Sequence, residues 1–115
     1  MSEHMKPTAK TSAATQAEFD GIGSALAKAG VEVSKMFGME SLKTKGKAFA
    51  GLFGDSMVFK LSGTAHGQAM KLKGAKLFDP SGMGRPMKEW VVVPRIHSER
   101  WKTLAETAKK YVSGK

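Results

Sequence analysis

The sequence predicts an α+β domain built on an antiparallel β-sheet, and three observations support that fold class. Apolar residues recur at helical spacing near both ends of the chain, over residues 16–29 and after Ser98. Between these helices, two β-rich runs flank Gly54-Asp55, a dipeptide typical of two-residue hairpin loops. A further apolar run, EWVVV at residues 89–93, has the length of a buried strand. The order of these segments indicates a sheet with an N-terminal and a C-terminal helix packed on it and a short helix between strands.

The composition is that of one globular domain with a basic surface. A chain of 115 residues is long enough for a single modest core. The absence of cysteine excludes disulfides, thiolate metal sites and cysteine nucleophiles. Because the chain has no apolar run of membrane-spanning length and no signal-peptide core near its start, we expect a cytoplasmic protein with no membrane partner. A net charge of +9 favours a polyanionic partner, although a basic surface also serves solubility.

The first helix is expected to follow a tail. Residues 1–14 are rich in Lys, Thr, Ser and Ala and have no apolar period, so we expect them to be disordered and the domain to span residues 15–113. Thr15 and Glu18 have the spacing of a capping box, in which each side chain bonds the other's backbone N–H. Gly30 is expected to end the helix, because glycine readily adopts the left-handed conformation that closes helices.

Extended segments are expected next. β-branched residues after a glycine predict a strand over residues 31–37, and a second short strand is expected over residues 40–42. Residues 43–47, Lys-Thr-Lys-Gly-Lys, read as a basic turn. The two runs 48–53 and 56–61 then form the hairpin.

The two-residue turn predicts the register of that hairpin. It places Leu52 opposite Met57. It also places Ala50 opposite Phe59, so that one face is wholly apolar. The other face is apolar with less uniformity, and its members are Phe49, Gly51, Phe53, Ser56, Val58 and Lys60. A strand pair that is apolar on both faces predicts helices or other chain on both sides, or a partner surface.

The second half of the chain is expected to hold a helix over residues 63–73, capped by Thr64, and then a loop over residues 74–88. Pro94 closes the strand at residues 89–93, because proline cannot continue a ladder. Ser98 is expected to cap the last helix. The apolar face of that helix comprises Trp101, Leu104, Ala105, Ala108, Tyr111 and Val112.

No motif predicts a catalytic or metal site, and no cofactor is expected. Residues 82–87 begin like a dinucleotide-binding loop but lack its third glycine and have a proline where a helix should start. Gly46-Lys47 lacks the first glycine and the hydroxyl residue of a phosphate loop. Asp79, before a proline, is interpreted as a turn-former. Three histidines, interpreted as isolated surface residues, have no second ligand at helical spacing: His4, His66 and His97.

Methionine and tryptophan each allow two interpretations. Methionines can fill an irregular core or line an adaptable groove, and we favour the core; those concerned are Met36, Met39, Met57, Met70, Met83 and Met87. Trp90 and Trp101 lie within apolar patterns and are expected to anchor the core. A base-stacking role for Trp90 is the alternative.

Three segments in order resemble the TfoX N-terminal domain family, the amino-terminal module of the TfoX/Sxy competence regulators. They are SKMFGM at residues 34–39, GKAFAGLFGDSMVFKL at 46–61 and FDPSGMGRPMKEWVVVP at 78–94. The resemblance runs over residues 17–113. It implies terminal helices packed on an antiparallel sheet, a two-layer architecture similar to the secretion-chaperone-like and YjbR-like folds. It also implies a non-enzymatic role.

Long members of that family look like transcriptional co-regulators with a second, helical domain. The present chain ends at Lys115, before such a domain, so we do not carry a competence role over to it. The expected function is that of a small regulatory or binding domain that engages a protein or a nucleic acid. The oligomeric state is left open. The candidate partner-binding residues are Met36, Phe37, Lys43, Lys45, Lys47, Arg85, Met87 and Lys88.

Alternatives remain for these residues and for the function. The planar fork of Arg85 suits a phosphate or carboxylate, but it can equally tether the loop to Asp79 or Glu89. The lysines at positions 43, 45 and 47 can also form a merely solvated hairpin end. Direct nucleic-acid binding driven by charge is the second functional hypothesis. An enzyme with an unrecognised pocket and a module or homodimer that pairs through the hairpin are the third and fourth.

Overall fold

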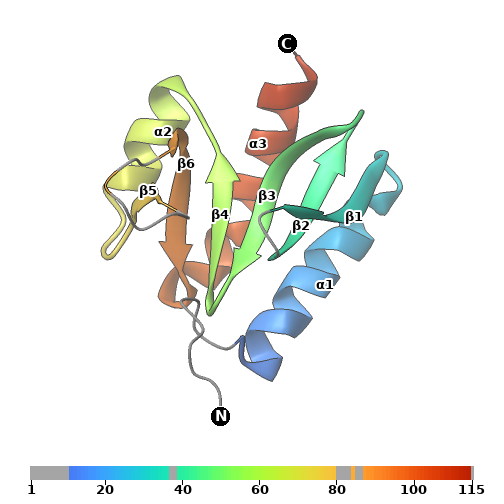
Figure 1. Ribbon diagram of the computed structural model, residues 1–115, viewed down its shortest axis with the longest axis horizontal. Helices are drawn as coiled ribbons and strands as arrows, with labels where there is room; N and C mark the ends of the chain where they lie inside the picture. The colour runs from blue at the N-terminus through green and yellow to red at the C-terminus, as the bar shows by residue number, and fades with distance from the viewer. Residues whose placement is uncertain (1–10, 37–38, 80–83, 85–86, 115) are drawn as a thin grey trace.

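Six antiparallel strands form one sheet in the order β1-β2-β3-β4-β6-β5 (Figure 1). The computed structural model describes residues 11–36, 39–79, 84 and 87–114. Its elements are α1 (Ala13–Ala27), β1 (Val31–Met36), β2 (Met39–Thr44), β3 (Lys47–Phe53), β4 (Ser56–Lys60), α2 (Gly63–Met70), β5 (Lys76–Phe78), β6 (Met87–Pro94), the 3-10 helix η1 (Arg95–Arg100) and α3 (Trp101–Ser113). The predicted α+β class, with its terminal helices and short intervening helix, is confirmed.

Helix α1 begins earlier than predicted because its cap is Ser12. The Ser12 hydroxyl accepts a hydrogen bond from the Thr15 backbone N–H at 3.2 Å, and Thr15 itself is buried. The predicted capping box at Thr15 and Glu18 is therefore wrong. The β3–β4 turn also contacts this helix end, since Asp55 Oδ1 accepts from the Ser12 N–H at 2.8 Å. Of the segment expected to be a tail, residues 13 and 14 lie in α1 and residues 1–10 lie outside the described part of the chain.

The β3–β4 hairpin has the predicted register. Leu52 pairs with Met57 and Ala50 pairs with Phe59. The turn follows the expected chemistry, because Gly54 has a positive φ of 59°, which glycine adopts more readily than any other residue.

A bulge changes the face of one β3 residue. Leu42 pairs with Ala50, whereas Lys43 pairs with Ala48, so Phe49 is an extra residue opposite β2. Phe49 consequently packs in the same cluster as Ala50. The prediction that Phe49 shares a face with the other odd-numbered residues of β3 is wrong for this reason.

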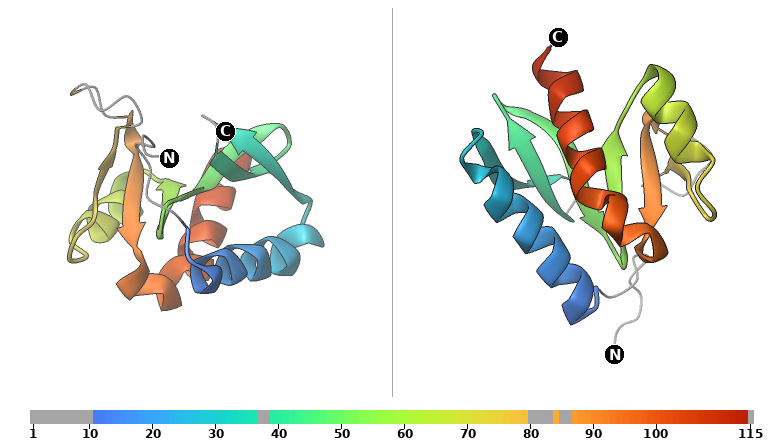
Figure 2. Two further views of the ribbon diagram at one scale, coloured as in Figure 1. Left: turned by 60° about the horizontal axis from the view of Figure 1, so that its bottom comes forward. Right: turned by 180° about the vertical axis from the view of Figure 1, so that it is seen from behind.

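All three α-helices lie on one face of the sheet (Figure 2). Between the helices and this face lies the larger apolar core, which includes Phe19 of α1, Phe59 of β4 and Trp101 of α3. Trp101 is fully buried, and its indole Nε1 donates to the Val93 carbonyl at 3.3 Å. The expectation that Trp101 anchors the core is confirmed.

A second apolar cluster lies on the opposite face, which we call the far face. Its buried members are Val58, Phe78, Trp90 and Val92, and the half-buried residues Met39, Ala48, Phe53 and Met87 pack against it. The rings of Phe53 and Phe78 meet edge to face with centroids 5.1 Å apart. Their strands, β3 and β5, are separated by β4 and β6, which in a flat sheet would put them about 14 Å apart. The ring contact therefore requires the sheet to twist and curve strongly toward the far face.

The C-terminal third differs from the prediction in two places. Residues 76–78, expected in a loop, form β5, because β6 offers them a backbone ladder. Ser98 does not cap the last helix. It lies within η1, where His97 has non-helical angles (φ −108°, ψ 23°), and α3 begins after Arg100. Helix α2 likewise has Ser62, and not Thr64, at its N-cap position.

Candidate functional site

Three of the sequence-predicted lysines lie at one end of the sheet. Ala50 on β3 pairs with Phe59 on β4, and the Leu61 N–H donates to the Glu89 carbonyl on β6 at 2.7 Å. The pairing of β3 with β4 ends at Ala50 and Phe59. Beyond it, the starts of β3 and β6, the strands that carry Lys47 and Lys88, lie at the same end of the sheet but diverge to either side of α3 (Figure 1). Lys45 lies at the adjoining β2–β3 turn. All three side chains are exposed.

The β2–β3 turn projects its lysines because of its backbone conformation. Lys45 (φ 53°) and Gly46 (φ 77°) both have positive φ, as a type I′ hairpin turn requires. Lys43, one step into β2, is half-buried and pairs in register with Glu32 of β1. Lys43 thus has a carboxylate neighbour across the strands, which sets it apart from Lys45 and Lys47.

Helix α3 adds a lysine that the sequence analysis did not select. The C-terminal end of α3 lies at the same end of the molecule as the β2–β3 turn (Figures 1 and 2). It carries the exposed Lys110. No local pattern could have found Lys110, since only the packing of α3 on the sheet determines where it lies. We call Lys45, Lys47, Lys88 and Lys110 the basic end.

The acidic residue nearest to Lys88 in the chain is already engaged. Glu89 Oε1 lies 3.8 Å from Lys60 Nζ, and Tyr111 of α3 donates its hydroxyl hydrogen to Glu89 Oε2. Within the described residues, no member of the basic end forms an ion pair. The positive potential of these four side chains therefore remains directed toward solvent.

The structure separates the other predicted site residues from the basic end. Met36 ends β1 opposite Met39, at the far end of β2 from Lys45. The length of β2 puts about 17 Å between these two ends. Met87 is half-buried against the far-face cluster. Phe37, Met83 and Arg85 lie outside the described residues. The alternative in which Arg85 tethers the loop to Asp79 or Glu89 therefore stays a prediction.

The burial of the remaining methionines and of Trp90 tests whether these residues belong to the core or serve a binding surface. Met57 is fully buried, while Met39 and Met70 pack against the two clusters, so these three are core residues. Trp90 is only 6% exposed. This confirms Trp90 as a core anchor and leaves little of its ring surface for base stacking.

Two histidines join α2 and the chain that follows it to neighbouring elements. His66 Nε2 donates to the Lys88 carbonyl at 2.7 Å, and His97 Nε2 donates to the Lys73 carbonyl at 2.9 Å. The interpretation of these two as isolated surface residues is wrong. His4 lies outside the described residues, among which no group of three potential metal ligands occurs.

Two aspartates have structural contacts. Asp79 Oδ2 accepts from the Gly84 N–H at 2.9 Å, the kind of side-chain-to-backbone bond expected of a turn-former. Hydrogen bonds from the Ser12 backbone N–H, and then from the Thr15 and Ser12 hydroxyls, lower the pKa of Asp55 below its ordinary value of 3.8. Asp55 therefore holds the α1 terminus to the β3–β4 turn as a carboxylate.

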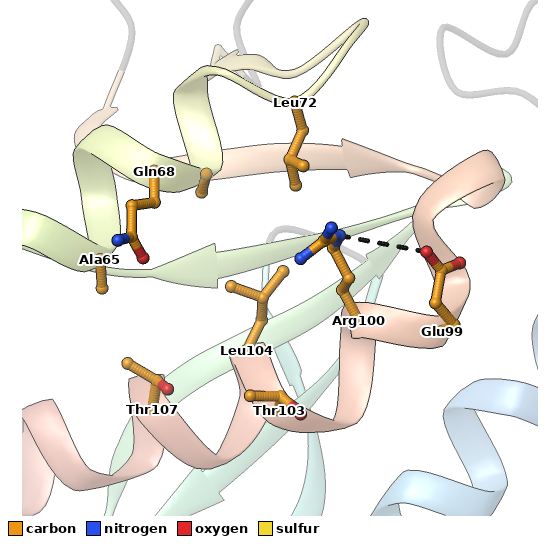
Figure 3. Close-up of a pocket in the computed structure, with 9 residues that line it drawn as sticks. Ala65, Gln68, Leu72, Glu99, Arg100, Thr103, Leu104 and Thr107 are labelled. Atoms are coloured by element: carbon orange, nitrogen blue, oxygen red, sulfur yellow. Dashed lines mark ion pairs between the residues drawn. The ribbon is translucent and has the colours of Figure 1, made fainter.

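A groove of about 420 Å³ runs between α2 and α3 (Figure 3). One wall is formed by Ala65, Gln68 and Ala69 of α2 and by Leu72, which follows it. The other is formed by Glu99 and Arg100 of η1 and by Thr103, Leu104 and Thr107 of α3. None of these residues was predicted to line a site, although Leu104 was predicted on the apolar face of the last helix. Their spacing of three and four could have been noticed on each helix, but it does not show that the two faces oppose each other.

No helix in the described ranges is both long and apolar enough to cross a membrane. No protein-family model matches the chain, and neither the curated proteins nor the solved structures contain a significant match to it.

Proposed function

We propose that this protein is a small, non-catalytic regulatory or binding domain, of the kind that its resemblance to the TfoX N-terminal family implies, and that it acts in the cytoplasm through its basic end. One observation carries the proposal. Four exposed lysines come from three separate parts of the fold, the β2–β3 hairpin, β6 and α3, and lie at one end of the molecule without an ion-pair partner in the described chain. Such a distribution of charge favours an acidic partner.

An acidic protein surface suits the basic end better than a nucleic acid does. Typical DNA-binding surfaces neutralise about six to ten phosphates, whereas the basic end offers four lysines. Tyr111 of α3 lies next to Lys110 in the chain and is half-buried, so it can add apolar contact. Protein interfaces combine an apolar centre with a charged rim in this way.

The test compares two variants with the same change of charge. In the first, Lys45, Lys47 and Lys88 are each replaced by Glu. In the second, three exposed lysines that follow α2, at positions 71, 73 and 76, are replaced by Glu. Each tagged protein is used to capture partners from native lysate at low salt. We expect the wild type and the control to retain the same acidic protein and the first variant to lose it. Retention by the first variant would refute the assignment of the basic end.

Nucleic-acid binding is the second candidate, and the net charge of +9 favours it. Four phosphate contacts predict a logarithmic salt slope near −3.6, so affinity for a duplex should fall about a hundredfold between 50 and 200 mM salt. Anisotropy of a labelled duplex of mixed sequence measures this slope. If the duplex does not bind even at 50 mM salt, the second candidate is eliminated while the first stands.

A further inference from the structure

The groove between α2 and α3 has a wall on each side. One wall consists of residues 65, 68 and 69 of α2 and of Leu72, which follows the helix, and the other of residues 99 and 100 of η1 and residues 103, 104 and 107 of α3. Within each helix the lining residues have spacings of three and four, which place them on one helix face. The two walls confront each other across a space of about 420 Å³ instead of packing together. A volume of this size is within the range of small-molecule sites.

The groove combines an apolar interior with polar groups at its rim. Ala69 is buried at its floor, and Leu72 and Leu104 are half-buried on opposite sides. Figure 3 shows Gln68 directed into the groove from α2. Thr103 and Thr107 add hydroxyl groups from α3. An apolar cleft with a few hydrogen-bonding groups is the usual character of a small-ligand site.

Arg100 is the cationic residue of the groove lining, and Glu99 is its acidic neighbour. Its guanidinium projects between Leu72 and Leu104 (Figure 3). Its Nε lies 4.0 Å from Glu99 Oε2, which is too far for a hydrogen bond, and the two side chains are 60% and 70% exposed. An exposed pair at this distance is weak. In the described chain the terminal guanidinium nitrogens have no hydrogen-bond partner, so they can bind a carboxylate with two parallel N–H donors.

The walls are held in place before any ligand arrives. The His66 hydrogen bond to the Lys88 carbonyl fixes α2 to β6. The His97 hydrogen bond to the Lys73 carbonyl fixes the chain after α2 to η1. A site whose walls are already ordered loses less entropy on binding.

From these features we infer that the α2–α3 groove binds a small organic carboxylate with a short apolar chain. The carboxylate pairs with the Arg100 guanidinium, and the apolar chain lies between Leu72 and Leu104 over Ala69. This site shares no residue with the basic end, so a negative result for one proposal does not count against the other.

The test uses hexanoate, with hexanol and acetate as controls that lack the charge and the apolar chain. Amide resonances of the ¹⁵N-labelled protein are followed during titration of each compound. We expect hexanoate to shift the amides of Ala69, Thr103 and Leu104 saturably and the controls to bind at least tenfold more weakly. Equal binding of hexanol would overturn the assignment of a carboxylate ligand, and no saturable shift with hexanoate would overturn the site.

Variants make the test specific. Arg100→Gln should weaken hexanoate at least tenfold, because it removes the charged donors. Arg95→Gln is the matched control, since Arg95 is exposed on η1 and does not line the groove. Ala65→Phe should obstruct the groove while leaving Arg100 in place. If an acidic amphipathic peptide shifts the same amides and hexanoate does not, the groove is a protein-docking site and the small-ligand proposal is wrong.

Discussion

The concavity of the far face can be measured as an energetic coupling between Phe53 and Phe78. The perturbations are Phe53→Leu, Phe78→Leu and the double variant. Each single change should cost about 1 kcal/mol, because it nearly conserves apolar volume. In a flat sheet three strand spacings would separate the strands by about 14 Å, and the two costs would simply add. The observed ring contact, with centroids 5.1 Å apart and planes inclined at 68°, predicts a coupling of about 1 kcal/mol.

The assay is urea unfolding followed by far-ultraviolet circular dichroism. This signal reports backbone structure, whereas the fluorescence of Trp90, which lies in the same cluster, would respond to the substitutions themselves. The free energies of unfolding of the four proteins give the coupling directly. A matched control pairs Phe53→Leu with Phe59→Leu. Phe59 belongs to the same hairpin but packs with the helices, so these two changes should be additive. If the Phe53 and Phe78 costs add to within about 0.3 kcal/mol, the sheet is not curved as described here.

Three other substitutions test the contacts that hold the fold together. Asp55→Asn should lower the free energy of unfolding at pH 7, because the Asp55 carboxylate, whose pKa is lowered in the folded protein, stabilises the fold while it is ionised. The difference in stability from the wild type should shrink as the pH falls below 3.8. Urea midpoints at pH 7 and pH 3 measure this difference, and a constant difference would contradict the prediction. Gly51→Val should lower the free energy of unfolding by about 2 kcal/mol, because a Cβ at this position would lie 2.9 Å from the Cε of Met39. Adding Met39→Ala should restore part of the lost stability, and failure to restore any would show that another contact is responsible. Tyr111→Phe removes the hydroxyl that bonds Glu89 and should cost about 1 kcal/mol, with an unchanged urea midpoint as the opposing result.

The sequence alone determined the local parts of this fold. The Gly54-Asp55 turn and the alternating residues beside it predicted the β3–β4 register residue by residue, because a two-residue loop permits few pairings. The strand before Pro94 and both terminal helices were also predicted, from local apolar patterns. Their apolar patterns repeat over a few residues and depend little on the rest of the chain.

Only the tertiary structure decided the features that join distant segments. Asp55 holds the start of α1 from 43 residues away. The three residues of β5 are too few for a pattern and form a strand only because β6 provides a ladder. Assembly of the basic end likewise depends on where Lys110 falls when α3 packs on the sheet. Each of these contacts gains its energy from a partner remote in sequence, so no local window of residues contains the information that predicts it.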